Sequence, residues 1–146
     1  MAISITNADV KRKCMLPASD TTYDTSIDAL IAEMQPAVEF TIADSYLANT
    51  ADTRLQAALK LGILEVISGE FLQQLAREMG STEEFSIGGV TIGQIKEHGP
   101  VLIQQGAARL ASFLKSMQPM MTETNISSTT KDTEPVFAAD ETEQVL

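Results

Sequence analysis

The sequence has no tryptophan, a single cysteine, a single histidine and few aromatic residues. Aromatic side chains make up 5% of its 146 residues, whereas 44% of the residues are apolar. The lone cysteine, Cys14, cannot form an internal disulfide, which is typical of a protein made in a reducing compartment. No apolar run approaches the roughly 18 residues that a membrane-spanning helix needs. We therefore expect one folded domain, made in the cell interior, without a membrane segment.

Basic residues are also scarce. Lys and Arg number 10 against 20 Asp and Glu, which gives a net charge of −10. A nucleic-acid-binding domain normally carries a basic stripe, so this balance argues against specific binding of DNA or RNA. The high apolar fraction argues equally against a chain that is disordered throughout.

Half of the net negative charge lies in a short C-terminal segment. Residues 119–146 contain six acidic residues, one lysine, many Ser and Thr, and no glycine. Such a composition buries too little apolar surface to offset the entropy lost on ordering. We predict a helical domain over 1–118 and an arm that is disordered when free. Its two apolar pairs, Val136-Phe137 and Val145-Leu146, are candidate anchors for a partner or incidental residues of a solubilising tail.

The first half of the domain has the periodicity of helices. The polar segment Thr6-Asn7-Ala8-Asp9 is a plausible cap, with Asp9 near the positive end of a short helix that runs to about Met15. Apolar residues at steps of three and four then predict a second helix. It is expected to open at Ser19 or Asp20, because both are good capping residues. Pro36 lies inside this second pattern and should kink or divide the helix, whose continuation is expected to end near Leu47.

The longest helix is predicted from Thr53 to Met79. This segment contains no proline and is followed by Gly80, a good helix stop. Its leucines and isoleucines occupy more than one side, which is typical of a helix at the centre of a domain. Gly62 and Gly69 weaken the helix itself but permit close approach of another helix.

The spacing of apolar residues changes after this helix. Phe85-Ser86-Ile87 and Val90-Thr91-Ile92 alternate apolar and polar residues on either side of Gly88-Gly89, which predicts a short hairpin near 85–92. A closing helix is expected from about Pro100 to Met117. Its predicted buried face consists of Ile103, Ala107, Leu110, Leu114 and Met117.

The residues that usually carry catalysis are isolated. His98 stands alone beside a turn, and Cys14 has no evident histidine partner, so a solvated histidine and a buried or incidental thiol are the better interpretations. Asp20, Asp24 and Asp28 recur every four residues and suit a hard cation. Helix-dipole stabilisation explains acids at a helix start more simply. We expect no catalytic residue, cofactor or metal.

The run Lys11-Arg12-Lys13 is the one basic cluster in the sequence. We interpret it as a solvated helix face, with contact to DNA phosphates or to an acidic partner as the alternative.

Three segments carry a resemblance to a known family. The order of elements resembles that of the head–tail connector, or adaptor, proteins of tailed bacteriophages, over roughly residues 3–117. Its opening pattern is similar around Ile3 and Asp9. The segments that look like the family's long helix, hairpin and closing helix are LQAALKLGILE at 55–65, FSIGGVTI at 85–92 and GAARLASFL at 106–114.

The resemblance implies a mainly α fold, a small helical bundle around a long central helix, with one short β-hairpin and an extended C-terminal arm. It implies a structural virion protein of the neck, made in the host bacterial cytoplasm. Copies would form a homo-oligomeric ring, following the portal's twelvefold symmetry, between the portal and the stopper or tail-completion protein. DNA would pass through the ring without specific binding.

The resemblance also assigns tasks to parts of this chain. The arm would hold the portal through Val136, Phe137, Val145 and Leu146. The hairpin would supply an inter-subunit or tail-side contact through Phe85, Ile87, Gly88, Gly89, Val90 and Ile92.

Two other functions fit the sequence. One is a small helical protein-binding or regulatory module with a disordered acidic tail. The other is an enzyme with a carboxylate metal site built on Asp20, Asp24 and Asp28. The first need not form a closed ring, and the second would bind Mg²⁺, Mn²⁺ or Ca²⁺.

Overall fold

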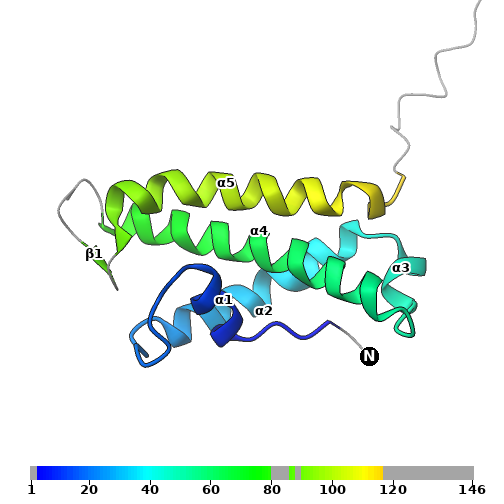
Figure 1. Ribbon diagram of the computed structural model, residues 1–146, viewed down its shortest axis with the longest axis horizontal. Helices are drawn as coiled ribbons and strands as arrows, with labels where there is room; N and C mark the ends of the chain where they lie inside the picture. The colour runs from blue at the N-terminus through cyan, green and yellow to red at the C-terminus, as the bar shows by residue number, and fades with distance from the viewer. Residues whose placement is uncertain (1–2, 80–85, 88–89, 117–146) are drawn as a thin grey trace, which may run out of the picture. The chain divides into compact units, whose positions relative to one another are not determined.

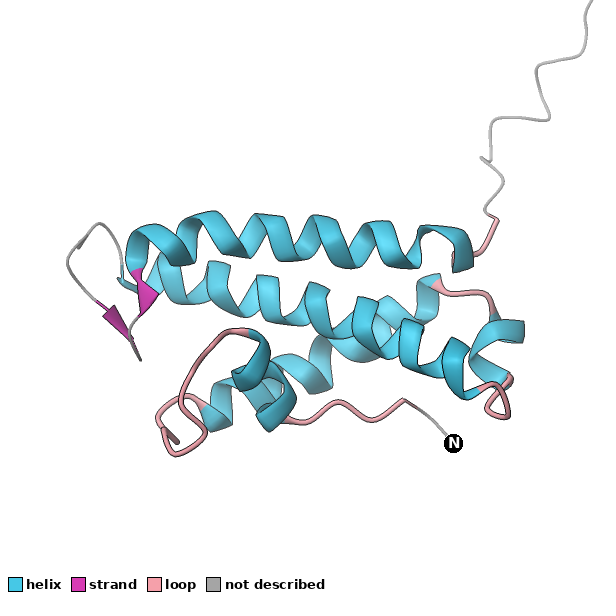
Figure 2. Ribbon diagram, viewed as in Figure 1, coloured by secondary structure: helices cyan, strands magenta, loops and turns pink. Residues whose placement is uncertain are grey.

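The computed structural model describes residues 3–79, 86–87 and 90–116, and for residues 79, 86–87 and 90–96 the backbone alone. This described part is mainly helical, as predicted (Figure 2). The predicted arm, with Val136, Phe137, Val145 and Leu146, and the predicted boundary at 118 lie outside the described residues. The elements are α1 (Asn7–Lys13), α2 (Asp24–Thr41), α3 (Asp44–Ala48), α4 (Thr53–Met79), β1 (Ser86–Ile87), β2 (Val90–Thr91), α5 (Ile92–Leu110) and the 3-10 turn η1 (Ala111–Phe113).

The long helix α4 has the bounds that the sequence predicts, Thr53–Met79. Its start is fixed by Asp52, whose Oδ1 accepts hydrogen bonds of 3.1 Å from the backbone N–H of Arg54 and of Leu55. Helices α1 and α2 pack on one side of α4, and α5 packs along another (Figure 1). The prediction of a central helix is therefore confirmed. Its fully covered apolar residues are Leu59, Ile63, Leu64, Ile67, Phe71, Leu72 and Leu75.

None of the described helices combines the length and the apolar character needed to cross a membrane.

Helices α4 and α5 run antiparallel and meet at two pairs of glycines. A Cβ atom built on Gly69 would lie 2.5 Å from the carbonyl oxygen of Gly99, and one on Gly106 would lie 2.6 Å from that of Gly62. Real Cβ atoms do not come this close to backbone oxygens, so only glycine permits this separation of the helices. The close approach predicted for Gly62 and Gly69 is confirmed.

Helix α1 is closed at both ends by local hydrogen bonds. At its start, Thr6 and Asp9 form a capping box, with the Thr6 N–H donating to Asp9 Oδ2 at 3.1 Å. Burial raises the pKa of Asp9, but the hydrogen bonds from Thr6 and Lys60 outweigh it and leave that pKa below its usual value. At its end, the Leu16 N–H donates to the Lys11 carbonyl at 2.8 Å, and the Met15 N–H donates to that of Arg12 at 3.2 Å. This is a Schellman motif.

Met15 occupies the left-handed position of that motif, with φ of 63°. Glycine is the usual residue there because a Cβ atom strains this conformation by about 1 kcal/mol. The Met15 side chain is 70% exposed, so little packing is lost when it is removed. We expect Met15→Gly to raise the free energy of unfolding by up to about 1 kcal/mol in urea titrations. Met15→Ala keeps the strained Cβ, so an equal gain from alanine would contradict this explanation.

The predicted start of the second helix, Ser19 or Asp20, was wrong by four or five residues. Helix α2 begins at Asp24, because Asp20 instead accepts a hydrogen bond of 3.0 Å from the Thr22 N–H and forms a turn. Pro36 was predicted to kink or divide this helix, and division is excluded because α2 runs through Pro36 to Thr41. Burial of Ile27 and Leu30 against the core outweighs the one backbone hydrogen bond that proline removes.

The second helix also ends earlier than predicted. The chain leaves the helix at Ile42, which is extended and completely buried, and forms an isolated antiparallel bridge with Leu114. Its continuation to near Leu47 is a separate short helix, α3. A long-range pairing, invisible to local periodicity, therefore replaces one predicted helix by two.

The closing helix differs most from its prediction. It begins at Ile92, eight residues before the expected start at Pro100, and its α-helical part ends at Leu110. Because glycines 99 and 106 face α4, the helix is rotated from the predicted orientation. Ala107 is exposed and Leu114 is 45% exposed, so their predicted burial was wrong, whereas that of Leu110 is confirmed. Ile103 is partly buried, and Met117 lies outside the described residues.

The segment predicted to form a hairpin is described only in part. Its backbone contains two strands of two residues, β1 and β2, paired antiparallel with Ser86 opposite Thr91 and Ile87 opposite Val90. Ile92 begins α5. Phe85, Gly88 and Gly89 lie outside the described residues.

Candidate interaction surface

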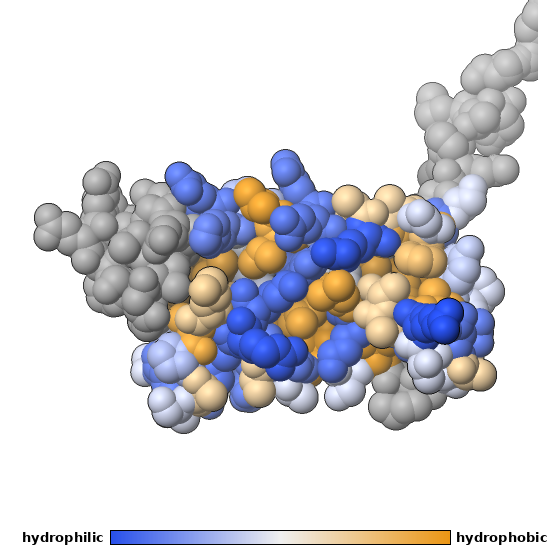
Figure 3. Space-filling model, in the orientation of Figure 1, coloured by the Kyte–Doolittle hydropathy of each residue, from blue (hydrophilic) through white to orange (hydrophobic). Residues whose placement is uncertain are grey.

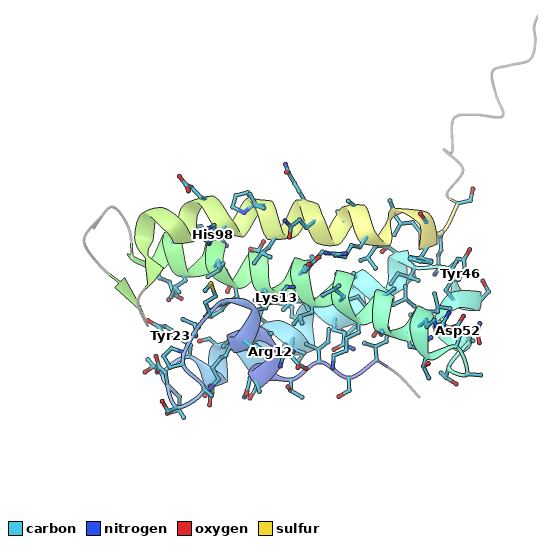
Figure 4. All side chains as sticks on the ribbon, viewed as in Figure 1. Arg12, Lys13, Tyr23, Tyr46, Asp52 and His98 are labelled. Atoms are coloured by element: carbon cyan, nitrogen blue, oxygen red, sulfur yellow. The ribbon has the colours of Figure 1, made fainter. Side chains whose placement is uncertain are left out.

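Two residues of the basic run in α1, Lys11 and Lys13, form ion pairs with other helices of the protein. Lys11 is 5% exposed, and its Nζ lies 2.7 Å from Asp24 Oδ1 and donates to the carbonyls of Ala18 and Asp20 at 3.2 and 2.9 Å. Only Arg12 has a well-exposed side chain (Figure 4). The interpretation of this run as a solvated or DNA-facing surface was therefore wrong for Lys11, whereas the Lys13 side chain is 29% exposed. A buried ammonium must be paired, and here it joins α1 to the start of α2.

Lys13 takes part in a second internal cluster, which the sequence did not reveal. Glu65 of α4 is 1% exposed, and its two carboxylate oxygens contact cations from two other helices. Lys13 Nζ of α1 lies 3.3 Å from Oε2, and Arg109 Nε of α5 donates to Oε1 at 2.7 Å. A buried carboxylate is stable only when it is paired in this way. The cluster joins both α1 and α5 to α4.

The three aspartates considered for a metal site have separate partners. Asp24 pairs with Lys11, Asp28 accepts a hydrogen bond of 3.1 Å from Asn7 Nδ2, and Asp20 accepts from Thr22. These hydrogen bonds from Thr22 lower the pKa of Asp20. Among the residues that the structure describes, no three ligand-type side chains gather in one place. The aspartates act as caps and ion-pair partners in this arrangement.

Cys14 and His98, the single cysteine and the single histidine, lie in different surroundings. Cys14 is 4% exposed, and its Sγ donates to the Ser68 carbonyl at 3.6 Å, which confirms the interpretation as a buried thiol. Burial raises the pKa of Cys14 to about 12. His98 is exposed on α5 (Figure 4).

The raised pKa makes stability depend on alkaline pH. In the unfolded chain the thiol ionises near its ordinary pKa of 9.0, whereas in the folded protein it stays protonated up to about pH 12. The unfolded state therefore binds fewer protons in this range, so stability is complete below pH 9 and falls as pH rises toward 12. We expect a slope of about 1.4 kcal/mol per pH unit from this group. Urea titrations of the wild type and of Cys14→Ala between pH 8 and 10.5 measure it, and equal slopes would contradict the assignment.

An apolar patch lies at the end of the body where the described chain finishes. Its residues, which we call the Phe40 patch, are Phe40, Tyr46 and Leu114, which are 70%, 37% and 45% exposed. They come from segments that the Ile42–Leu114 bridge and nearby backbone hydrogen bonds join at this end. Lys115 Nζ lies 4.3 Å from the centroid of the Phe40 ring, at cation–π distance. The exposed fraction of Phe40 is unusual for a large aromatic side chain, and grouped exposure of this kind marks an interaction site.

The backbone beneath this patch is fixed. The Ala43 N–H donates to the Phe113 carbonyl at 2.9 Å, and the Lys115 N–H donates to that of Thr41 at 2.8 Å. The Tyr46 and Phe113 rings meet edge to face at 5.1 Å between centroids. Tyr46 lies near the end of α4 that Asp52 caps (Figure 4). The patch is therefore a preorganised surface, which lowers the entropy lost on binding.

Few features of the sequence indicate this patch. Leu114 was expected on the buried face of the last helix, and Phe40 is one of several apolar residues that follow Pro36 in the second helix. One signal was available: Phe40 lies beside the apolar stripe of the second helix and not on it.

Comparison of this chain with protein-family models, with curated proteins and with solved structures finds no match.

Proposed function

We propose that this protein is a structural ring adaptor between the portal and the stopper or tail of a tailed bacteriophage. The proposal begins from the resemblance of residues 3–117 to the connector family. A mainly helical body around the long helix α4 agrees with that family's fold. In this role the protein extends the channel for DNA and acts through its surfaces, without catalysis.

The structural observation that supports a partner-binding role in this proposal is the Phe40 patch, and the resemblance is what makes the portal the proposed partner. It exposes two aromatic side chains and an aliphatic one, close to Lys115 among the last described residues of the body. A large partner could bind the Phe40 patch and the acidic segment 119–146 at the same time. Two linked contacts raise the affinity far above that of either one.

The charge of the chain is consistent with a channel. DNA must slide past the adaptor, and a basic wall would hold its phosphates. A net charge of −10 repels them. The proposal also gives the segment near 85–92 a contact with the neighbouring subunit or the tail, because a ring needs a head-to-tail interface that closes by rotation.

The first test is binding of the full-length chain to purified portal. We expect Phe40→Ser to weaken this binding at least about tenfold, because it removes the most exposed aromatic of the patch. Met15→Ser is the matched control, since Met15 is also 70% exposed but lies at the end of α1. Equal affinities for the two variants would contradict a role of the patch in portal binding.

The arm has a test of its own. We expect a chain that ends at Gln118 to keep its helical circular dichroism and to bind portal more weakly. Unchanged binding by this shorter chain would reject the assignment of Val136, Phe137, Val145 and Leu146 as portal anchors.

The second candidate function is a soluble protein-binding module. The Phe40 patch fits it equally well, because one exposed aromatic group on a rigid end also suits a single small partner. Stoichiometry distinguishes the two functions, since the module binds its partner without forming a closed ring.

A further inference from the structure

Four cationic side chains gather on one face of the body, and two largely covered carboxylates hold them there. Asp9 contacts Arg12 at 3.1 Å and Lys60 at 3.3 Å. Glu65 contacts Lys13 at 3.3 Å and Arg109 at 2.7 Å. Because each carboxylate serves two cations, each leaves one positive charge uncompensated. We call these four cations the basic face, which consists of Arg12, Lys13, Lys60 and Arg109.

The basic face is continuous and open to solvent. Asp9 and Lys13 lie four residues apart, on the same side of α1. Figure 4 labels Arg12 and Lys13 on α1, which packs against α4, and Figure 3 shows strongly hydrophilic side chains over α1, α4 and α5 in the same view. The four cationic side chains are 29–72% exposed, whereas the carboxylates of Asp9 and Glu65 are 13% and 1% exposed. A ligand therefore meets the cations before the acids.

This surplus of positive charge is local. Elsewhere among the described residues each ion-paired cation has an acid of its own, as in the pairs Lys11–Asp24, Arg77–Glu70 and Lys115–Asp44. The whole chain has a net charge of −10. A long polyanion such as DNA would meet that repulsion over most of its length. A short acidic peptide can contact the basic face alone, so the charge pattern favours a peptide.

The chain itself contains such a peptide. Asp140-Glu141-Thr142-Glu143 has three acids in four positions, and no other four consecutive residues of the sequence match it. We call it the acidic run. It belongs to residues 119–146, a length of chain that spans up to about 90 Å when extended and can reach a neighbouring molecule. Each copy supplies one acidic run and one basic face, which is the head-to-tail arrangement that a closed ring requires.

We infer that the basic face binds the acidic run of a second copy of this chain. The inference rests on the proposed ring, for which it names a contact between subunits. The contact uses acids only and leaves the pairs Val136-Phe137 and Val145-Leu146 to the portal. Because the contact consists of exposed charges, association is expected at low salt and is lost at high salt. An apolar contact between two acidic chains would show the opposite dependence, because salt screens their repulsion.

The test measures self-association of the full-length chain by analytical ultracentrifugation, up to roughly 1 mM protein, at about 0.02 M and about 0.5 M salt. We expect the wild type to associate only at the lower salt. Arg12→Glu reverses the charge of the most exposed cation of the basic face and is expected to weaken association at least about tenfold. Arg54→Glu is the matched control, because Arg54 is also exposed but lies at the start of α4, outside the basic face. It is expected to change association less than about threefold.

A second variant leaves every residue of the described body unchanged. Asp140→Asn, Glu141→Gln and Glu143→Gln together are expected to weaken association at least about tenfold. These substitutions lower the net negative charge, so a change in general repulsion alone would strengthen association instead. A labelled DNA duplex at about 0.02 M salt tests the other class of anion, and we expect it not to bind.

Four results would overturn the inference: a wild type that stays monomeric at low salt, equal losses for Arg12→Glu and Arg54→Glu, unchanged association after removal of the three acids, or binding of the DNA duplex that Arg12→Glu abolishes. The result also separates this contact from the proposed function. Salt-sensitive association through the basic face, in a protein that is absent from virus particles, supports the contact and contradicts the ring. A monomeric wild type that is present at about a dozen copies per particle supports the ring and contradicts the contact.

Discussion

Replacing both Lys13 and Arg109 by methionine is expected to lower the free energy of unfolding by about 3 kcal/mol. The two substitutions leave the Glu65 carboxylate, 1% exposed, without either of its cations. Taking an ion out of water without a partner costs several kcal/mol. Each single substitution leaves one ion pair in place, so each is expected to cost less than half of the double change. Urea titrations with fixed m-values measure these differences.

The matched control removes the carboxylate as well. In the triple variant with Glu65→Met, the buried site holds only apolar groups of similar length, and replacement of a whole buried ion cluster is often neutral. We expect the triple variant to recover most of the lost stability. If it were as unstable as the double variant, the loss would come from packing rather than from the unpaired charge of Glu65.

Gly69→Ala is expected to lower the free energy of unfolding by about 2 kcal/mol. Alanine favours the helix by about 1 kcal/mol over glycine. Its Cβ would, however, lie 2.5 Å from the Gly99 carbonyl oxygen and 2.9 Å from the Ile103 nitrogen. Both atoms belong to the backbone of α5, so relief requires that the whole helix move away from α4.

Gly62→Ala provides the comparison for this position. Its Cβ would approach the end of the Leu110 side chain at 2.7 Å, but the nearest backbone oxygen is 3.3 Å away. A side chain can change rotamer where a helix backbone cannot, so Gly62→Ala is expected to cost less than half as much. Equal losses at the two positions would contradict the account of close backbone contact. The measurement is chemical denaturation of both variants beside the wild type.

The elements that the sequence predicted well are those set by local signals. Helix α4 lies between an aspartate cap and Gly80 and contains no proline, so its bounds followed directly. The capping box of α1 is likewise a pattern of neighbours, Thr6 and Asp9.

The errors in the fold have a common origin in contacts between distant residues. Pro36 and Pro100 were given the weight that they have in an isolated helix, yet packing on α4 holds both helices through them. The bridge from Ile42 to Leu114 joins residues more than seventy positions apart, and no local period reveals it.

The buried charges could be predicted only in part. Glu65 lies in a stretch of α4 that is otherwise uncharged from Leu61 to Ser68, which is a signal for a buried acid in need of a partner. Nothing in the sequence names Lys13 and Arg109 as those partners, because the tertiary fold brings the three helices together. The Phe40 patch was missed for the same reason, since a helical period locates a stripe but not which part of it is covered.

The proposal that the protein is a neck ring is tested most directly by its copy number in virus particles. Quantitative mass spectrometry of purified particles, with a peptide of the major capsid protein as internal reference, gives this number. We predict about a dozen copies per particle, as for a ring that follows the portal. Absence from particles that contain portal and tail peptides would contradict the adaptor function and leave the soluble binding module as the better account.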